Sequence, residues 1–238
     1  MKPVIVLPIW CQHEVEQFCW MMERWDVVTN TRLQYEFLIA CRFDFKGDTS
    51  RLEQLCKMYA PVKVTTLIGK YSTYPAAASE MWFRTMQLLY KQKDISFAFW
   101  LEHDVLPQNV KWFDILVDKW NKRDKHVNIM GQFLSDEWLD ANGHHLRGDA
   151  WGAHINGVAC YDPRVYNKAI DVRWDISQAW DIQLNLGDDT LGIDLHDMRI
   201  TDEHRASAGT SRLMTHGCKT IPEKEKIYNF VLEKLMNG

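Results

Sequence analysis

The sequence lacks the cysteine spacing that marks a zinc site or a redox motif. Its 238 residues include six cysteines but no C-x-x-C pair. Most of the six lie among apolar residues, which is typical of reduced thiols in a protein core. They are Cys11, Cys19, Cys41, Cys56, Cys160 and Cys218. We therefore expect a cytoplasmic protein in a reducing environment.

Long hydrophobic runs are also absent. No stretch reaches the roughly 18 apolar residues that a membrane span needs. The apolar run from Val4 to Trp10 is short and interrupted by Pro8, so it does not read as a signal peptide. We expect a soluble protein with no membrane partner.

A surplus of positive charge is missing as well. The formal net charge is −4 at pH 7, which gives no global attraction to nucleic acid. One short basic run consists of Lys119, Lys122, Arg123, Lys125 and His126. A local nucleic-acid patch would fit this run, but we interpret it as the solvated end of a helix.

Aromatic residues, by contrast, are plentiful. Eleven Trp, ten Phe and eight Tyr accompany a hydrophobic content of 46%, which fits a packed core and argues against disorder. At 238 residues the chain is long enough for one substantial domain and short for two. We expect a single α/β domain.

Apolar runs of strand length alternate with helical periodicity through the first half. Strands are predicted at residues 3–9, 35–41, 62–68 and 97–101, and helices at 15–25, 51–59 and 76–90, with a capping turn at 47–50. This alternation predicts a mostly parallel central sheet flanked by helices on both faces. Farther along we expect a helix at 112–120, strands at 128–133 and 153–161, a polar loop at 139–152 and a helix at 223–235.

The stretch from Phe97 to Pro107 organises the chain. Five apolar residues run directly into Glu102, His103 and Asp104, which predicts a buried strand that ends in charge. On an extended strand, carboxylates two residues apart point to the same side. Such a pair suits Mg²⁺ or Mn²⁺. Solvated acids at a strand end explain the residue types equally well.

Other polar residues have two readings each. Asp44, at the end of the second strand, either accepts hydrogen bonds from a nucleotide base or ribose, or forms a turn. Arg84 on a predicted helix either reaches a phosphate or faces solvent. We interpret His144 and His145 as exposed polar residues before metal ligands. On residue type alone His216 is a core histidine.

The order of elements resembles the GT-A class of nucleotide-sugar glycosyltransferases. In that class a βαβ half ends in a strand with a D-x-D-like motif, and an acceptor-side hairpin, an Asp after an aromatic residue and a late His follow. More narrowly, Phe99–Pro107, His154–Tyr161 and Thr215–Lys219 look like the corresponding stretches of small glycosyltransferases from bacteriophages and bacteria. The acidic motif departs from the pattern, because it reads Glu-His-Asp where the type sequence has two aspartates.

The resemblance implies a GT-A-like (Rossmann-like) fold in one domain over residues 1–238. Residues 1–107 would form the nucleotide-sugar-binding half, and residues 108–238 the acceptor-side half with its C-terminal helix. If the chain is encoded by a phage, the expected compartment is the cytoplasm of the host.

The resemblance also implies a metal site. Asp104 and His216 would bind Mn²⁺ or Mg²⁺. Glu102 reaches one methylene further than aspartate, so it would contact the donor ribose or a metal-bound water, or the metal itself. Lys219 would place a positive charge near the diphosphate.

On the acceptor side, an inverting transferase needs a base that takes the proton of the acceptor hydroxyl. Our candidate is Asp181, which follows Trp180, with Asp175 in reserve; either aspartate would also be explained as a helix start. Trp151 and Trp180 would offer stacking surfaces, and Asn156 lies in the acceptor-side hairpin.

Three classes of function follow. The first is a metal-dependent glycosyltransferase with a UDP-sugar donor, acting on a hydroxymethylated pyrimidine in phage DNA or on a cell-surface glycan. The second is a sugar-phosphate nucleotidyltransferase, against which the absence of glycine from Trp10–Glu14 argues. The third is a non-catalytic protein that binds nucleotide sugars or carbohydrates.

Overall fold

A computed structural model describes residues 1–134, 154–170, 180, 184, 194–197, 201–202 and 213–237. Within these ranges one seven-stranded sheet has the order β3-β2-β1-β4-β7-β6-β8. Its strands are β1 (Lys2–Ile9), β2 (Glu36–Cys41), β3 (Val62–Thr66), β4 (Ile95–Trp100), β6 (Val127–Leu134), β7 (His154–Tyr161) and β8 (Asp194–Asp197).

The first four strands are parallel, as the alternating pattern predicts. β1 pairs in parallel with β2 on one side and β4 on the other, and β3 extends the sheet beyond β2. β7 is antiparallel to both β4 and β6, whereas β8 is parallel to β6. The sheet is therefore mostly parallel, with one reversed strand, β7, between β4 and β6.

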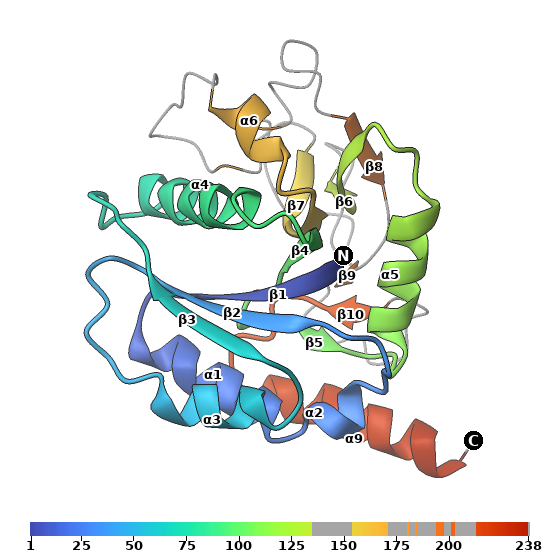
Figure 1. Ribbon diagram of the computed structural model, residues 1–238. Coiled ribbons are helices and arrows are strands. Elements are labelled where there is room, and N and C mark those ends of the chain that lie inside the picture. The colour runs from blue at the N-terminus through green and yellow to red at the C-terminus, as the bar shows by residue number, and fades with distance from the viewer. Residues whose placement is uncertain are drawn as a thin grey trace.

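Helices cover both faces of the sheet (Figure 1). They are α1 (Gln12–Met22), α2 (Trp25–Val28), α3 (Ser50–Lys57), α4 (Ala76–Tyr90), α5 (Trp112–Lys122), α6 (Val165–Ala169) and α9 (Ile221–Asn237). In Figure 1 the helices α1, α2, α3 and α9 lie below the sheet, and α4 and α6 lie above it. Both flanking layers and the bounds of α4 were predicted from the sequence.

Strand β1 shows why two cores form. Its apolar run has no polar alternation, so both faces of the strand are apolar. Ile5, Leu7 and Ile9 belong to the core that contains α1, α3 and α9. Val4 and Val6 point the other way, into the core beneath α4.

One detail of the predicted strands is wrong. Strand β4 ends at Trp100, and Glu102 and Asp104 lie beyond it in a turn closed by a hydrogen bond from the Val105 N–H to the Glu102 carbonyl, at 3.2 Å. The two carboxylates are therefore not on an extended strand. The predicted strand at 153–161 is confirmed as β7, and the Asn156-Gly157 pair lies inside it.

A second, three-stranded sheet was not predicted. Strand β10 (Met214–Thr215) pairs antiparallel with β5 (Leu106–Pro107) and parallel with β9 (Thr201–Asp202). The Gln108 side chain also donates a hydrogen bond to Thr215 Oγ1. This small sheet carries the end of the chain back to the turn that follows β4.

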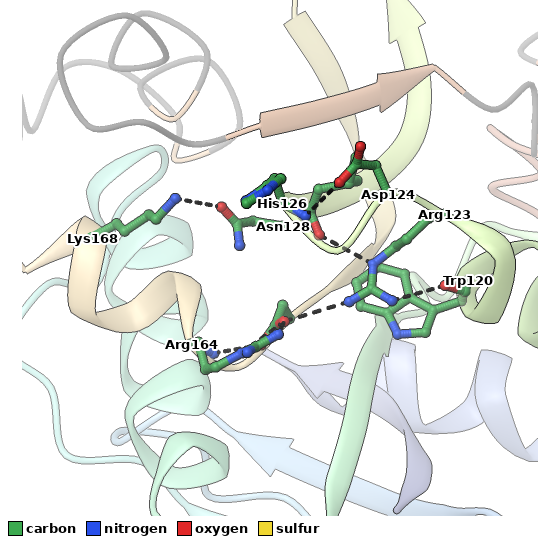
Figure 2. A network of polar contacts seen from close by, with 9 residues as sticks. Trp120, Arg123, Asp124, His126, Asn128, Arg164 and Lys168 are labelled. Carbon is green, nitrogen blue, oxygen red and sulfur yellow. Dashed lines mark hydrogen bonds and ion pairs between the residues drawn. The ribbon is translucent and has the colours of Figure 1, made fainter.

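The basic run near residue 120 belongs to a helix end. Lys119 and Lys122 lie in the last turn of α5, where Lys122 Nζ is 2.8 Å from Asp118 Oδ2. The next residue, Arg123, places its guanidinium 3.6 Å from the centre of the Trp120 ring and belongs to a polar network at the start of β6 (Figure 2).

Several predicted features lie outside the described residues. They are the loop at 139–152 with His144 and His145, and the side chains of Trp151, Asp175 and Asp181. Among the described helices, none has the length and apolar character that a membrane crossing requires.

Candidate functional site

A cavity of about 420 Å³ opens at the carboxyl end of the parallel strands. Its walls come from distant parts of the chain, namely the ends of β1 and β4, the start of α4, strand β7 and the segment after β10. In open α/β sheets ligands bind at this edge. The volume falls within the range of roughly 300–1,000 Å³ typical of small-molecule sites.

Three potential metal ligands meet in this cavity. His216 Nε2 lies 3.3 Å from Glu102 Oε2 and 3.4 Å from Asp104 Oδ1. One ligand atom from each residue lies within 4.8 Å of the others. Two carboxylates and an imidazole form a donor set that suits Mn²⁺ or Mg²⁺ with further oxygen ligands.

The small sheet explains how residues so far apart in sequence meet. The antiparallel pairing of β5 with β10 brings Leu106 opposite Thr215. The Cys218 N–H then donates to the Asp104 carbonyl at 2.8 Å. His216 is thereby held against the turn that follows β4.

Asp104 is the most constrained member of the cluster. It is 6% exposed, and its Oδ1 atom is buried without a hydrogen-bond donor among the described residues. Burial alone would raise the pKa of this carboxyl, but the His216 ring beside it outweighs burial and holds the pKa below its usual range. A buried, ionised oxygen whose charge is balanced here by an imidazole 3.4 Å away fits a cation ligand, because a buried carboxylate needs a positive partner.

Glu14 is a carboxylate of the cavity that the sequence reading missed. It lies in the first turn of α1, where its Oε2 accepts hydrogen bonds from the backbone N–H groups of Trp10 and Cys11. Burial raises the pKa of Glu14 to about 7 in spite of these hydrogen bonds. Its sequence signal, an acidic residue in a first helical turn just after a strand, is the same as that of an ordinary cap.

His103 lies between Glu102 and Asp104 in the chain and beside Glu14 in the fold. Its Nδ1 atom lies 3.7 Å from Glu14 Oε1. Burial lowers the pKa of His103 to about 4, so the ring is neutral at pH 7.

An aromatic wall closes another part of the cavity. Trp180 is 5% exposed and packs against Trp100, with ring centres 5.8 Å apart. Gly157 lies directly beneath it, where an added Cβ would come within 2.2 Å of the Trp180 ring. Glycine at this point of β7 lets the indole approach the strand backbone.

No family model and no curated protein matches the chain. Solved structures do resemble it. The galactosyltransferase LgtC, in complex with donor and acceptor sugar analogs, matches with a TM-score of 0.54 and 11% identity over 97% of this chain and 95% of LgtC. S. aureus TarS 1–349 in complex with UDP matches with a TM-score of 0.52 and 10% identity over 100% of this chain.

This chain has the GT-A fold. It spans only 66% of the length of the TarS chain. A nucleotidyltransferase is also similar, since the CMP:2-keto-3-deoxy-manno-octonic acid synthetase complexed with CTP matches with a TM-score of 0.51 and 11% identity over 98% of this chain and all of that one. At such identities the likeness establishes the fold, and the chemistry has to be argued from the site.

Within the GT-A fold, the structure brings several predicted site residues to the cavity. Lys219 and Trp180 line it together with the potential metal ligands Glu102, Asp104 and His216. Asn156 belongs to β7, one residue before Gly157 of the cavity wall. The roles assigned to these residues stay predictions.

Two predicted residues do not line this cavity. Asp44 forms a two-pronged ion pair with Arg42, whose Nη1 atom also donates to the Ser72 carbonyl at 3.1 Å. Arg84, on α4, donates to Gln87 Oε1 at 3.2 Å. Nucleotide contacts of Asp44 and Arg84 stay predictions.

Proposed function

We propose that this protein is a metal-dependent glycosyltransferase that moves a sugar from a UDP-sugar to a hydroxyl acceptor. The observation that carries the proposal is the cluster of Glu102, Asp104 and His216, which converges in the cavity at the carboxyl end of β4. The galactosyltransferase LgtC and the UDP complex of TarS share the fold that surrounds it.

The chemistry of sugar transfer fits the charges around this cluster. Departure of a nucleoside diphosphate builds negative charge on its oxygens. A bound Mn²⁺ or Mg²⁺ supplies charge neutralisation there. Asp104, His216 and Glu102 would hold the cation, and the exposed Lys219 would bind the diphosphate from the rim of the cavity.

The acceptor side is proposed to lie along Trp180. Its indole, together with Trp151 and Asn156, would orient the acceptor sugar or base. Asp181 follows Trp180 directly and would take the proton of the attacking hydroxyl in an inverting reaction. In this division residues 1–107 bind the donor and residues 108–238 the acceptor.

The loop after β1 argues against nucleotidyl transfer as the alternative function. Binding of a nucleoside triphosphate at such a loop relies on free backbone N–H groups. Here the N–H groups of Trp10 and Cys11 already donate to Glu14. A phosphate in the same place would lose these donors and meet a carboxylate. This favours sugar transfer.

The proposal also covers the chemical class of the acceptor. We propose two classes, a hydroxymethylated pyrimidine in phage DNA and a cell-surface glycan, with the host cytoplasm as the compartment for the first. A DNA acceptor requires positive charge beside Trp180, because phosphate contacts dominate DNA affinity. Loss of transfer with rising salt for DNA, but not for a glycan, would distinguish the two classes.

The test is a screen of nucleotide sugars for binding and for release of the nucleoside diphosphate, with Mn²⁺, with Mg²⁺ and with EDTA. The wild-type protein should release the diphosphate only with metal. Asp104→Asn should lose at least about tenfold in metal-dependent donor binding, because it replaces a charged ligand with a neutral one. Asp118→Asn, on the exposed surface of α5, is the matched control and should behave as wild type.

Three outcomes would contradict the proposal in different ways. Release of pyrophosphate from a nucleoside triphosphate and a sugar phosphate would establish nucleotidyl transfer. Donor binding without any turnover, unchanged in Asp181→Asn, would indicate a binding protein. Absence of binding to every nucleotide sugar would show that the cluster is structural.

A further inference from the structure

Lys224 is a fully buried cation at the start of the C-terminal helix. It is 0% exposed and lies one turn before Ile227 on the buried face of α9. Lysine is almost never fully buried unless it has a partner. Sequence reading offered no reason for it, because residues 223–235 look like an ordinary charged amphipathic helix.

The partner of Lys224 is the turn after β4, which contains Glu102, His103 and Asp104. Its Nζ atom donates a hydrogen bond to the backbone carbonyl of His103, the middle residue between Glu102 and Asp104. The carbonyls on either side are also held, that of Glu102 by the Val105 N–H at 3.2 Å and that of Asp104 by the Cys218 N–H at 2.8 Å. Three consecutive carbonyls of the turn therefore each accept a hydrogen bond.

These three donors have different origins. The Val105 N–H belongs to the turn itself, and the Cys218 N–H belongs to the segment that carries His216. The third donor, the Lys224 ammonium, is a side-chain group and comes from helix α9. It is therefore the one that a substitution can remove while the backbone stays intact.

We propose that Lys224 is a positioning residue for the metal site, and that its hydrogen bond to the His103 carbonyl sets the separation of Glu102 and Asp104 needed for cation binding. This inference rests on the metal cluster of the proposed function. Metal ligands depend on such outer partners, which fix their orientation. A loose turn would leave two like charges free to move apart.

The charge of Lys224 and its hydrogen bond predict opposite effects. An ammonium group behind the cluster repels a divalent cation, so its removal by charge alone would tighten metal binding. Loss of the hydrogen bond frees the turn and weakens binding. A residue that acts only in core packing would change protein stability and leave metal affinity alone. The sign of the change in affinity therefore identifies the role.

The experiment measures the Kd for Mn²⁺ of the full chain at pH 7 by electron paramagnetic resonance, without any nucleotide. Lys224→Met keeps the length of the side chain and removes the donor, and we expect Mn²⁺ to bind about tenfold more weakly. Lys226→Met, at an exposed position of the same helix, should match wild type. Lys224→Arg keeps a donor and should fall between wild type and Lys224→Met.

An unchanged or smaller Kd in folded Lys224→Met would overturn the inference and leave the metal site standing. If Lys224→Met does not fold, the Kd for Mn²⁺ is measured on Lys224→Gln at low temperature, because the glutamine amide is too short to replace the ammonium. A wild-type Kd in Lys224→Gln would equally overturn the inference. If the wild-type protein itself binds no Mn²⁺, the proposed metal site fails together with the inference that rests on it.

Discussion

The two ends of the central sheet differ in how their buried charges are paired. At the amino end of the parallel strands, the buried and half-buried charges are paired with opposite charges. At the carboxyl end, carboxylates gather around one cavity, and one of their buried oxygens has no donor among the described residues. We therefore interpret the charges at the amino end as stabilising the fold and those at the carboxyl end as candidates for binding a ligand.

Asp162 shows the pattern at the amino end. It follows the reversed strand β7 and is 3% exposed. Its carboxylate accepts hydrogen bonds from the backbone N–H and the guanidinium of Arg164, and it lies 3.5 Å from Arg123 Nη2. Figure 2 shows Arg123 and Arg164 in the surrounding network, with the Lys168 Nζ donating to Asn128 Oδ1 at 2.7 Å. The Asp162 carboxylate is therefore paired with two guanidinium groups.

At the carboxyl end, an imidazole takes the place of the guanidinium groups, because His216 Nε2 lies 3.4 Å from Asp104 Oδ1. Asp104 Oδ1 has no described donor, and burial raises the pKa of Glu14 to about 7. Buried charge of this kind is expensive, and proteins keep it mainly where a ligand or a reaction uses it. The difference between the edges, more than the cavity itself, indicates where the chemistry takes place.

The largest expected effect is on protein stability and concerns Asp162, at the amino end of the parallel strands. Asp162→Ala would leave the half-buried Arg123 without its carboxylate and should lower the free energy of unfolding by about 3 kcal/mol. Urea denaturation would measure the loss. The Kd for Mn²⁺ should stay the same, because the metal cluster lies at the other end of the sheet. A weaker Kd in folded Asp162→Ala would break the division between the two edges.

Glu14 provides the next prediction. Its pKa rises from 4.5 in the unfolded chain to about 7 in the fold, so the unfolded chain releases this proton first as pH increases. The contribution of Glu14 therefore lowers the free energy of unfolding as pH rises from about 4.5 to 7, by about 3 kcal/mol in total. Relative to wild type, Glu14→Gln should gain this amount between pH 5 and pH 8.

Urea denaturation in EDTA at the two pH values would measure the gain of Glu14→Gln, with Glu16→Gln as a control on the exposed side of the same helix. A constant difference between wild type and Glu14→Gln would show that Glu14 is ionised at an ordinary pKa.

Gly157→Ala tests the aromatic wall. The new Cβ would fall within 2.2 Å of the Trp180 ring, so the indole must move, at a cost of about 1–3 kcal/mol. We expect a reduced kcat/KM for sugar transfer and an unchanged Kd for Mn²⁺. Thermal unfolding and transfer kinetics would be measured together. Full transfer activity would exclude Trp180 from the acceptor site.

Glu36 provides the smallest effect, with a sign opposite to that of Glu14. Burial would raise the pKa of Glu36, but the hydrogen bond from Lys2 and the charge of Lys63 lower it below its usual value. Its contribution is therefore complete above the unfolded pKa of 4.5 and is lost as pH falls through the lowered folded pKa.

Glu36→Gln should cost less than about 1 kcal/mol at pH 7, since Lys2 and Lys63 are partly exposed. The cost should vanish toward pH 3 in the same urea titration. A loss that grew as pH fell would mean that Glu36 is not stabilised by these lysines.

Local patterns predicted the elements but not the turn that carries the site. The bounds of α4 and the parallel order of the first strands follow from apolar periodicity, which depends on neighbouring residues. Glu102, Asp104 and His216 were named from residue type and resemblance. Their meeting depends on the pairing of β5 with β10, whose two-residue strands carry too little periodicity to be read from sequence.

The sequence by itself determined that the chain forms a mostly parallel sheet between two helical layers, because unbroken apolar strands such as β1 are stable only when both faces are covered. Only the tertiary structure decided which carboxylates line the cavity. Glu14 reads as a helix cap and Lys224 as a surface lysine until the fold places Glu14 in the cavity wall and buries Lys224 against the turn after β4. Burial and partners arise from contacts between distant segments, and these contacts determine which charges remain free to bind a ligand.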